Sequence, residues 1–536
     1  MKVARNILTI ILLFATTIIK ADTNDYEIIV YGATPSGIAA AVAAAREGKK
    51  VVIIEPLNIV GGMMSGGLSF SDSNQTARES LGGIFEEIHL RIEKIYKNKG
   101  IKLPYDVSVK DNRKWMYEPH VAEQVFLDML REEGVSYILN ETIKSAKKKD
   151  SKIESIKMYS GRKFTAKVFI DASYEGDLLD AAGVSYVVGR EARSEFNESL
   201  GGARYPKDKV NLKATDSKGK LLPFMNSKNL SPEGSGDKRI MTYSYRLCLS
   251  SDPENQVPFT KPVNYNPEDF KIFKDYYKAN PTVRTPIDFY PLPNKKFDGN
   301  NGISLQLSSG LVGENYKYPE AKPKERQKIW DAHRNFTEGL LYFLQTDKSL
   351  PEAIQKQMAT LGYAKDEFAN SNHFPPVLYV REGRRMKGAY FLTQKDILET
   401  VEKNDPIGIS SFPIDSHDCQ RIATADGGFI NEGTIFPAHV KGRYIGQPHQ
   451  IPYRAITPKI DECTNLLVPV SLSASHVAFS SIRVEPTWIV LGQSAGIAAS
   501  MAIEENKAVQ SLDYSNLAKR LKAQKQVLEL PTLPKQ

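Results

Sequence analysis

The segment from Glu27 to Glu55 constrains the fold of this chain most strongly, because it combines two strands, a glycine-rich turn and a helix in a fixed order. A strand at 27–31 leads into a turn, an alanine-rich helix at 38–46 and a second strand at 50–54. The turn reads Gly32-Ala33-Thr34-Pro35-Ser36-Gly37. This order is that of a Rossmann dinucleotide site.

The turn is expected to hold the pyrophosphate of a dinucleotide. Gly32 and Gly37 let the backbone turn sharply and approach the ligand, and the following helix offers free N–H groups and a positive dipole end. Glu55 lies about 20 residues beyond the turn, the spacing at which a carboxylate accepts hydrogen bonds from a ribose. Thr34 stands where a second glycine is usual. An ordinary βαβ unit with a glycine turn is the alternative.

A second glycine cluster extends from Gly61 to Gly67. Bare glycines a few residues beyond the acidic position let the backbone approach a ligand, so this cluster predicts a further cofactor contact. A flexible loop is the alternative. Farther along, a buried strand ends in Asp171 and Ala172, where it meets small and acidic residues.

Periodicity predicts the remaining elements. Helices are expected at 81–98, 119–133, 325–345, 352–361 and 487–505. Strands at 135–139, 152–159 and 163–170 are expected to form a β-meander, with 147–150 as a solvated turn, and a further strand is expected at 465–470. The region from 190 to 440 is rich in proline and aromatic residues and predicts a mixed α/β cap.

The length and composition predict a two-domain globular protein of the α/β class. The chain has 536 residues, of which 41% are hydrophobic and 25% charged. The net charge of +8 is spread along the chain, and no basic stretch interleaved with aromatic residues argues for nucleic acid. A Rossmann-like part with a β-meander is expected at 22–190 and 441–510, an inserted substrate domain at 191–440, and a tail at 511–536.

Residues 1–21 are expected to be a signal peptide. Lys2 and Arg5 precede an apolar run at 7–19, which is short for a membrane span, and Ala21 is a small residue at the expected cleavage point. An uncleaved anchor is the alternative. Without a twin-arginine pair, export as an unfolded chain is expected, to the periplasm or the exterior, so the chain would meet its cofactor there and keep no membrane span after cleavage.

Cysteine and histidine spacing give no metal motif. Cys248, Cys419 and Cys463 are far apart in the sequence, so one disulfide is possible but no pairing can be assigned. Because the chain lacks Cys-x-x-Cys and His-x-x-x-His pairs, no structural metal is predicted.

Motifs at both ends of the chain resemble those of secreted FAD-dependent oxidoreductases of the glutathione-reductase-like superfamily, in the group often labelled "FAD-dependent oxidoreductase" or "xanthan lyase". At the C-terminal end they are Arg-x-Glu-Pro-Thr at 483–487 and Leu-Gly-Gln-Ser-Ala-Gly at 491–496. The middle of the chain matches strongly only at 381–388, Arg-Glu-Gly-Arg-Arg-Met-Lys-Gly.

The resemblance implies a set of FAD contacts. The segment 492–496 is implied to lie beside the flavin ring, and Asp171 and Ala172 beside the adenosine half. The implied cofactor-binding residues are Gly32, Thr34, Pro35, Ser36, Gly37, Glu55, Gly61, Gly62, Met63, Asp171, Ala172, Gly492, Ala495 and Gly496. A second nicotinamide-binding βαβ unit and a redox cysteine pair are not visible, so NAD(P)H is not the expected electron donor.

Five polar residues are candidates for the chemistry. His476 is the first candidate for the base that takes a proton while FAD takes a hydride, with a structural turn histidine as the alternative. Arg483 would fix a substrate oxygen or a flavin carbonyl, or form an ion pair with an acid. Arg384 and Arg385 form a basic cluster with Arg381 and Glu382, which suits an anionic or carboxylated substrate or a domain-interface ion network. His449 lies in a polar, aromatic loop that is expected to border the pocket.

These observations predict an exported flavoenzyme that oxidises a small polar substrate, such as a sugar or carbohydrate fragment, with an unknown electron acceptor. Two alternatives stay open. One is a lyase or hydrolase that acts on polysaccharide and oxidises and re-reduces the sugar transiently. The other is a protein of the FAD fold that binds glycan without catalysis.

Overall fold

The computed structural model describes residues 26–531 except 112, 303–304, 400, 437–438, 442 and 444. The predicted signal peptide therefore lies outside the described residues. In the described part of the chain, no helix combines the length and the apolar character needed to cross a bilayer.

Five described strands form the parallel sheet predicted at the start of the chain. In spatial order they are β19 (Leu466–Leu467), β7 (Val168–Asp171), β1 (Ile28–Tyr31), β2 (Val51–Ile54) and β3 (Ser136–Ile138). Every residue of β1, β2 and β7 is buried. Their unbroken apolar sequence is typical of a parallel sheet that is covered on both faces. The expected Rossmann-like α/β fold is confirmed.

Helices cover one face of this sheet, and a small antiparallel sheet covers the other. On the helical face, the main hydrophobic core contains side chains of α1 (Pro35–Arg46), α3 (Gly83–Asn98), α4 (Pro119–Glu132) and α12 (Glu485–Glu504). The helix α13 (Tyr514–Ala523) packs against α12. The opposite face, which includes Ile29, Val52 and Phe169, packs against β4 (Ile143–Lys149), β5 (Lys152–Met158) and β6 (Lys163–Phe164). Successive strand residues point to opposite faces, so one strand contributes to both cores.

The meander differs from the prediction at both of its ends. Residues 136–138 form β3, which pairs in parallel with β2 rather than with the meander. The strand expected at 163–170 divides into β6, which pairs with β5, and β7, which pairs with β1. The β4–β5 hairpin does turn at Asp150, where φ is 54°. The strand expected at 465–470 is shortened to β19.

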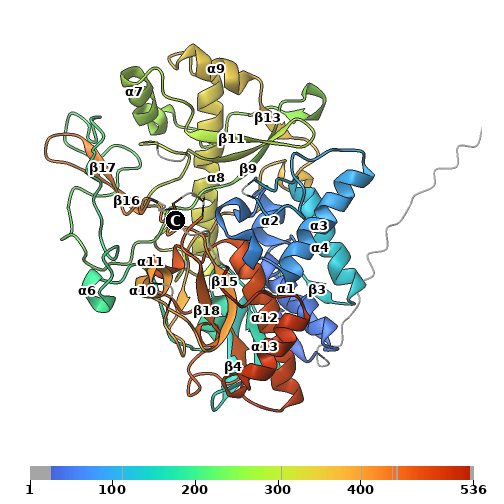
Figure 1. Cartoon of the computed structure of the whole chain (residues 1–536). Helices are drawn as coiled ribbons and strands as arrows, with labels where there is room; N and C mark the ends of the chain where they lie inside the picture. The colour runs from blue at the N-terminus through green and yellow to red at the C-terminus, as the bar shows by residue number, and fades with distance from the viewer. Residues whose placement is uncertain are drawn as a thin grey trace, which may run out of the picture.

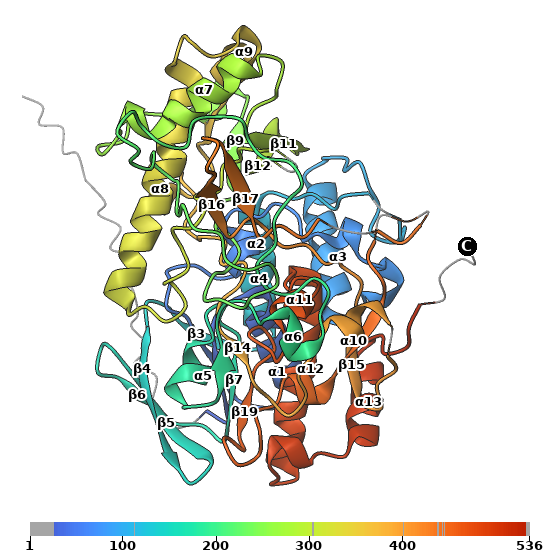
Figure 2. The ribbon, with the colours of Figure 1, turned by 90° about the vertical axis from the view of Figure 1, so that its left-hand side faces the viewer.

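The inserted part contains a second sheet, which is antiparallel. Its described strands run in the order β10 (Gln256–Val257), β13 (Gly362–Ala364), β9 (Leu247–Ser250), β12 (Lys296–Asn301) and β11 (Ile287–Leu292). The helices α7 (Lys271–Ala279), α8 (Pro323–Thr346) and α9 (Glu352–Ala359) accompany it. Figure 1 shows this part above the parallel sheet, and Figure 2 shows α8 descending from it toward β4–β6. The predicted helices at 325–345 and 352–361 are confirmed.

Short elements connect the two parts. Among them, β14 (Arg385–Met386) pairs with β8 (Tyr186–Val187), β15 (Pro406–Ser410) with β18 (His449–Pro452), and β16 (Gln420–Ala423) with β17 (Phe429–Glu432). The short helices are α2 (Gly62–Gly66), α5 (Asp177–Ala181), α6 (Arg193–Phe196), α10 (Gln394–Leu398) and α11 (His476–Phe479). The strands β14 and β15 lie within the expected inserted segment, 191–440, but their partners β8 and β18 lie outside it. The chain therefore returns to the Rossmann-like part before residue 440.

Among the described helices, α1 and α12 share the most extensive contact, and they lie side by side in Figure 1. A Cβ added to Gly492 would lie 2.1 Å from the Ser36 carbonyl oxygen, and one added to Gly496 would lie 2.1 Å from the Ala40 carbonyl oxygen. The two backbones can approach this closely only because both positions lack a side chain. The segment 492–496 is therefore helical and packs on α1.

We expect Gly496→Ala to destabilise the protein by about 3 kcal/mol, because the added methyl group must push α1 and α12 apart. The control is Gly134→Ala, whose added Cβ would have no neighbour within 4 Å but whose φ of +64° makes alanine strained. It should cost only about 1 kcal/mol. Chemical denaturation of both variants measures the difference, and equal losses would contradict the packing argument.

Candidate functional site

The turn after β1 is formed by close backbone contacts with the end of β7. Gly32 has a φ of +104°, and a Cβ placed on it would lie 2.8 Å from backbone atoms of Ala172 and Ser173. A Cβ on Gly37 would lie 2.0 Å from the Gly32 carbonyl oxygen. Both predicted glycines are therefore needed for the shape of the turn, and Ala172 lies directly against it.

Thr34 replaces a glycine because its side chain caps α1. The Thr34 hydroxyl accepts a hydrogen bond from the Gly37 N–H at 3.2 Å and donates one to the Ala172 carbonyl at 2.8 Å. Pro35 follows in the first turn of the helix, where the missing N–H costs nothing. The threonine thus fixes the helix start and ties it to β7.

Glu55 lies at the end of β2 with its carboxylate turned toward the same turn. It accepts hydrogen bonds from the N–H groups of Ala33 at 2.6 Å and Leu57 at 2.8 Å. Burial raises the pKa of Glu55 to about 8, although both N–H groups favour the charged form. Two backbone N–H groups thus hold the carboxylate at the turn.

Asp171 is satisfied within its own loop. Its carboxylate accepts hydrogen bonds from the Ser173 N–H and hydroxyl and from the Leu179 N–H. Burial raises its pKa to about 7. Its observed role is to shape the turn after β7, which in turn positions Ala172.

The second glycine cluster forms α2 and faces Tyr174. A Cβ on Gly62 would lie 2.6 Å from the Tyr174 hydroxyl, which also accepts a hydrogen bond from the Met63 N–H at 3.0 Å. The same hydroxyl donates to Glu485 at 2.7 Å. Gly61, with a φ of +106°, precedes this helix. The second cluster, β7 and the start of α12 therefore meet at Tyr174.

A cavity of about 210 Å³, here called the turn cavity, opens beside these elements. Its lining includes Gly32, Thr34, Glu55, Gly62 and Tyr174. Arg326 and Trp330 of α8 close it from the side of the inserted part. Four of the predicted cofactor residues, Gly32, Thr34, Glu55 and Gly62, thus line one cavity.

A larger cavity of about 380 Å³, here called the polar cavity, lies between the two parts of the molecule. Its lining includes Arg246, Asn301, Arg381, Ser416, His417 and Arg483. Two segments of the chain extend from one cavity to the other. The first runs from Gly62, in the wall of the turn cavity, to Asp72, in the wall of the polar cavity. In the second, Leu378 lines the turn cavity and the next residue, Tyr379, lines the polar cavity. The two cavities are therefore neighbours.

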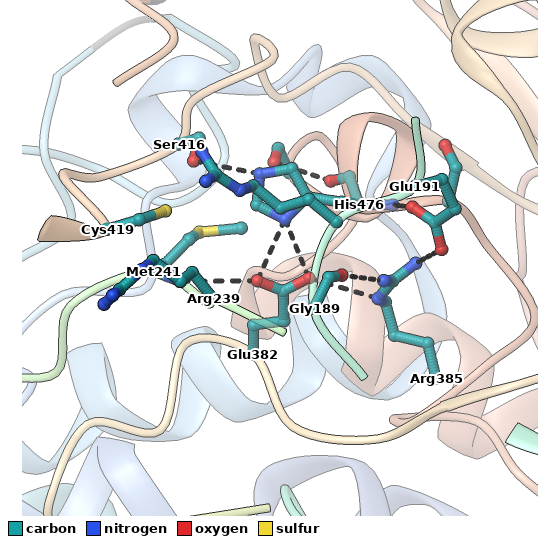
Figure 3. Close-up of polar contacts among 12 residues, drawn as sticks. Gly189, Glu191, Arg239, Met241, Glu382, Arg385, Ser416, Cys419 and His476 are labelled. Carbon is teal, nitrogen blue, oxygen red and sulfur yellow. Dashed lines mark hydrogen bonds and ion pairs between the residues drawn. The ribbon is translucent and has the colours of Figure 1, made fainter. Parts of the chain in front are cut away.

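His476 reaches the polar cavity through Ser416. Its Nδ1 lies 2.9 and 3.0 Å from the carboxylate oxygens of Glu382, and its Nε2 lies 3.2 Å from the Ser416 hydroxyl (Figure 3). Nδ1–H can donate to the carboxylate oxygens of Glu382, and in that tautomer of the neutral ring Nε2 is an acceptor facing the Ser416 hydroxyl. The same hydroxyl lies 3.4 Å from the His417 carbonyl oxygen. Polar contacts thus link the Glu382 carboxylate, the His476 imidazole and the Ser416 hydroxyl in the cavity wall.

Arg385 contacts the acids that hold His476 in place. Its guanidinium contacts Glu191 at 2.7 Å and Glu382 at 3.1 Å, and it also donates to the carbonyls of Gly189 and Ala474. Glu191 accepts the backbone N–H of His476 at 2.8 Å. Figure 3 shows both acids between Arg385 and His476. Arg385 lies outside both cavities, and its contacts are those of the ion network named as its alternative.

Arg384 and His449 also lie outside both cavities. Arg384 contacts Asp177 at 2.9 Å and Asp180 at 3.1 Å, which ties β14 to α5. His449 is buried in β18, with Nδ1 3.0 Å from the Gln447 carbonyl oxygen. The geometry gives neither residue a contact with a small molecule, so their substrate-binding role stays a prediction without structural support.

The N-terminus of α12, rather than its middle, lies near the cavities. Arg483 lines the polar cavity and donates to the Asp415 carbonyl at 2.8 Å. Glu485 opens α12, is 2% exposed, and leaves Oε2 without a hydrogen-bond partner. Gly492, Ala495 and Gly496 lie two turns or more along the helix, where the two glycines contact α1. Their predicted position beside a flavin ring is not supported.

One group of potential metal ligands occurs among the described residues: Glu118, His120, Asp366 and Glu367. The Nζ atom of Lys296 lies 2.7 Å from Glu118, 2.7 Å from Asp366 and 2.8 Å from Glu367. The lysine ammonium therefore supplies the cation at this place. The three cysteines are buried free thiols.

Sequence reasoning missed most of the polar cavity. Arg246, Asn301 and His417 belong to no motif, and they meet only because β9, β12 and the loop before β16 converge in the fold. Arg381 was visible as part of a basic cluster, but its neighbours in sequence, Arg384 and Arg385, turn away from the cavity.

The sequence profile of the family "FAD dependent oxidoreductase" matches residues 27–521. The chain therefore belongs to this family, and the protein is an FAD-dependent oxidoreductase. No curated protein is similar enough in sequence to count as a relative.

Solved structures resemble parts of the chain only distantly. The anhydrotetracycline hydroxylase OxyS from Streptomyces rimosus is 12% identical, with 31% of this chain and 38% of that one covered and a TM-score of 0.24. The bacillithiol disulfide reductase Bdr from Staphylococcus aureus is 18% identical over 28% and 38%, with a TM-score of 0.19. THI4 from Thermovibrio ammonificans is 15% identical over 32% and 67%, with a TM-score of 0.24. The chain thus spans well under half of the first two proteins.

The residues present fit FAD. Gly32 and Gly62 line the turn cavity with bare backbone, and Glu55 lines it with a buried carboxylate at the end of β2. Nearby, Oε2 of Glu485 is buried without a hydrogen-bond partner. The turn cavity suits the adenosine and pyrophosphate half, and the polar cavity suits the substrate side.

We expect Gly32→Ala to lose most of its FAD during purification, because the methyl group would overlap the backbone of Ala172 and strain the turn. Gly161→Ala is the control, since its φ of +95° is equally strained but its added Cβ would have no neighbour within 4 Å. The ratio of flavin absorbance to protein absorbance measures retention. Full retention by Gly32→Ala would show that the cofactor site is misplaced.

The raised pKa of Glu55 predicts a pH-dependent stability of the protein without FAD. A carboxyl whose pKa is raised from 4.5 to about 8 on folding stabilises the folded state fully below pH 4.5 and loses that contribution as the pH rises to about 8. The loss amounts to a few kcal/mol. Glu55→Gln should flatten this part of the pH profile in thermal melts, whereas an unchanged slope would contradict the assignment.

Proposed function

We propose that this FAD-dependent oxidoreductase is exported and oxidises a small polar substrate, such as a sugar or carbohydrate fragment, by hydride transfer to the flavin. The observation that carries the proposal is the polar cavity beside the turn cavity, because its wall offers hydroxyl, amide and guanidinium groups together with an acid–base chain. Export rests on the sequence of residues 1–21. The spread of positive charge gives no reason to propose a nucleic-acid partner.

The chemistry that FAD supplies when bound is acceptance of a hydride from a substrate carbon. Gly32, Gly62 and Glu55 would hold its adenosine and pyrophosphate half in the turn cavity. Arg483 and the first turn of α12 would place positive charge near its ring. The protein's own task is then to orient the substrate hydroxyl and to remove its proton.

The proton leaves through Ser416 and His476. The substrate hydroxyl donates to the Ser416 oxygen, Ser416 passes its own proton to Nε2 of His476, and Glu382 stabilises the imidazolium through Nδ1. The substrate thus loses a hydride and a proton, and its C–OH carbon becomes a carbonyl. Arg385 and Glu191 hold Glu382 and His476 in place, so they position the base rather than touch the substrate.

The electron acceptor that reoxidises the flavin stays unknown. The described residues of the inserted part form an antiparallel sheet with helices rather than a second parallel βαβ unit, which supports the proposal that NAD(P)H is not the partner.

Anaerobic mixing of the FAD-loaded protein with neutral and acidic sugars tests the proposed function. The expected result is bleaching of the flavin band by a hydroxylated substrate, with recovery when an artificial acceptor is added. If polysaccharide is cleaved without any acceptor being consumed, transient use of the flavin by a lyase is favoured instead. Flavin that no hydroxylated compound reduces would favour the non-catalytic alternative.

We expect His476→Gln and Ser416→Ala to keep FAD but to slow flavin reduction by about 100-fold or more, the typical contribution of a general base. Stopped-flow absorbance under anaerobic conditions measures the rate across pH. Ser231→Ala is the control, because Ser231 is half-buried and lines neither cavity. Its rate of flavin reduction should match that of the unmodified protein. An unchanged rate in His476→Gln would contradict the assigned proton path.

A further inference from the structure

Three guanidinium groups converge on the polar cavity from distant parts of the sequence. Arg246 immediately precedes β9, Arg381 precedes β14, and Arg483 precedes α12. Their exposed fractions are only 2% each. Buried cations are costly unless they are paired, so the partners of each one indicate which charge the cavity leaves uncompensated.

Two of the three arginines have a carboxylate partner. Arg246 donates to Asp298, which is fully buried on β12. Arg483 lies 3.7 Å from a carboxylate oxygen of Asp415 and donates to the carbonyl of the same residue. Their charges are compensated within the protein.

Arg381 has no ion pair among the described residues. Its Nη1 donates to the Thr242 carbonyl at 2.6 Å, and its Nη2 donates to Ser244 at 2.8 Å and Asn301 at 3.0 Å, all of them uncharged groups. Its Nε–H is buried without a partner. The guanidinium also lies 4.5 Å from the centre of the Tyr379 ring. These contacts orient the side chain but leave its charge available.

The electrostatic surroundings of Arg381 also disfavour its positive charge. Burial, together with the nearby Arg483 and Arg246, lowers the pKa of Arg381 to about 9, although Tyr379 and Asp415 oppose this shift. Asp72, Asp415 and Asp418 line the same cavity, but burial raises the pKa of each, which favours their neutral forms. A charged ligand carboxylate beside Arg381 would therefore stabilise its guanidinium. Arg384 and Arg385 offer no comparable place, since each already contacts two acids.

We propose that the substrate of the polar cavity carries a carboxylate and that Arg381 binds it. Arg381 is the one arginine of the described cavity lining without an ion pair, which matches a monoanion better than a dianionic phosphate, and its guanidinium matches the planar carboxylate. The amides of Asn300, Asn301 and Asn431 and the hydroxyls of Thr242 and Ser244 in the same cavity wall suit the hydroxyl groups of the same molecule. The substrate class is therefore a sugar acid, such as a hexuronate. This inference rests on the proposed function, because it names the substrate of the same cavity.

Calorimetric titration of the FAD-loaded protein with galacturonate and glucuronate, each against its neutral hexose, tests the proposal. The expected result is binding of at least one uronate ten-fold or more tighter than its hexose. Inorganic phosphate serves as the dianion probe and should bind more weakly than that uronate. Equal binding of acid and hexose, or no binding of either uronate, would overturn the proposal.

Variants assign the effect to one side chain. Arg381→Gln should reduce the preference for the uronate to less than two-fold, and Arg381→Lys, which keeps the charge, should retain part of it. Arg454→Gln removes a half-exposed arginine outside both cavities that pairs with Asp405, and it should behave like the unmodified protein. A preference that survives in folded Arg381→Gln, or that is lost equally in Arg454→Gln, would contradict the role of Arg381.

The same experiments separate this inference from the proposed function. If neutral hexoses bleach the flavin and the uronates bind no better, the oxidase proposal stands and the carboxylate site fails. If the uronate binds through Arg381 but no hydroxylated compound reduces the flavin, the carboxylate site stands and the oxidase proposal fails.

Discussion

The contact between α1 and α12 is the constraint on which the rest of the site depends. The glycines at 492 and 496 let the last long helix lie directly against the first one, although more than 400 residues separate them in the sequence. Because α12 is held there, its first residue, Glu485, meets Tyr174 just after β7. The segment before it brings Arg483 into the wall of the polar cavity and His476 into contact with Ser416 of that wall. The cofactor turn and the proposed base therefore come from opposite ends of the chain and depend on one helix pair.

Buried charge organises the layer around this helix pair. Arg385 holds two acids, and these two acids hold His476 through its ring and its backbone. Breaking such a buried network is costly because it leaves an uncompensated charge, so the network fixes the imidazole in one orientation. The same rule underlies the proposal for Arg381, since Arg246 and Arg483 have carboxylate partners whereas the described residues form no ion pair with Arg381.

The sequence predicted what local pattern determines. Strand, turn, helix and acid in the first βαβ unit are readable because glycine, alanine and β-branched residues have strong local preferences. The helix at 487–505 is readable because most of its residues are apolar or small. The sequence could not show that residues 136–138 join the parallel sheet, because a short strand gives no sign of its partner. It also could not show which arginines face the cavity, because Arg381, Arg384 and Arg385 differ only in how the chain turns after residue 381. His417 and Arg246 lie outside every motif, and only tertiary structure brings them together.

The central claim is that FAD takes a hydride from a hydroxylated substrate held in the polar cavity. The most direct test is the rate of anaerobic flavin reduction by a reducing substrate with deuterium in place of hydrogen at the oxidised carbon. If the flavin accepts the hydride, deuterium should clearly slow the bleaching, and one substrate molecule should be oxidised for each flavin reduced. Product formation with the flavin band unchanged, and with no effect of deuterium, would contradict it.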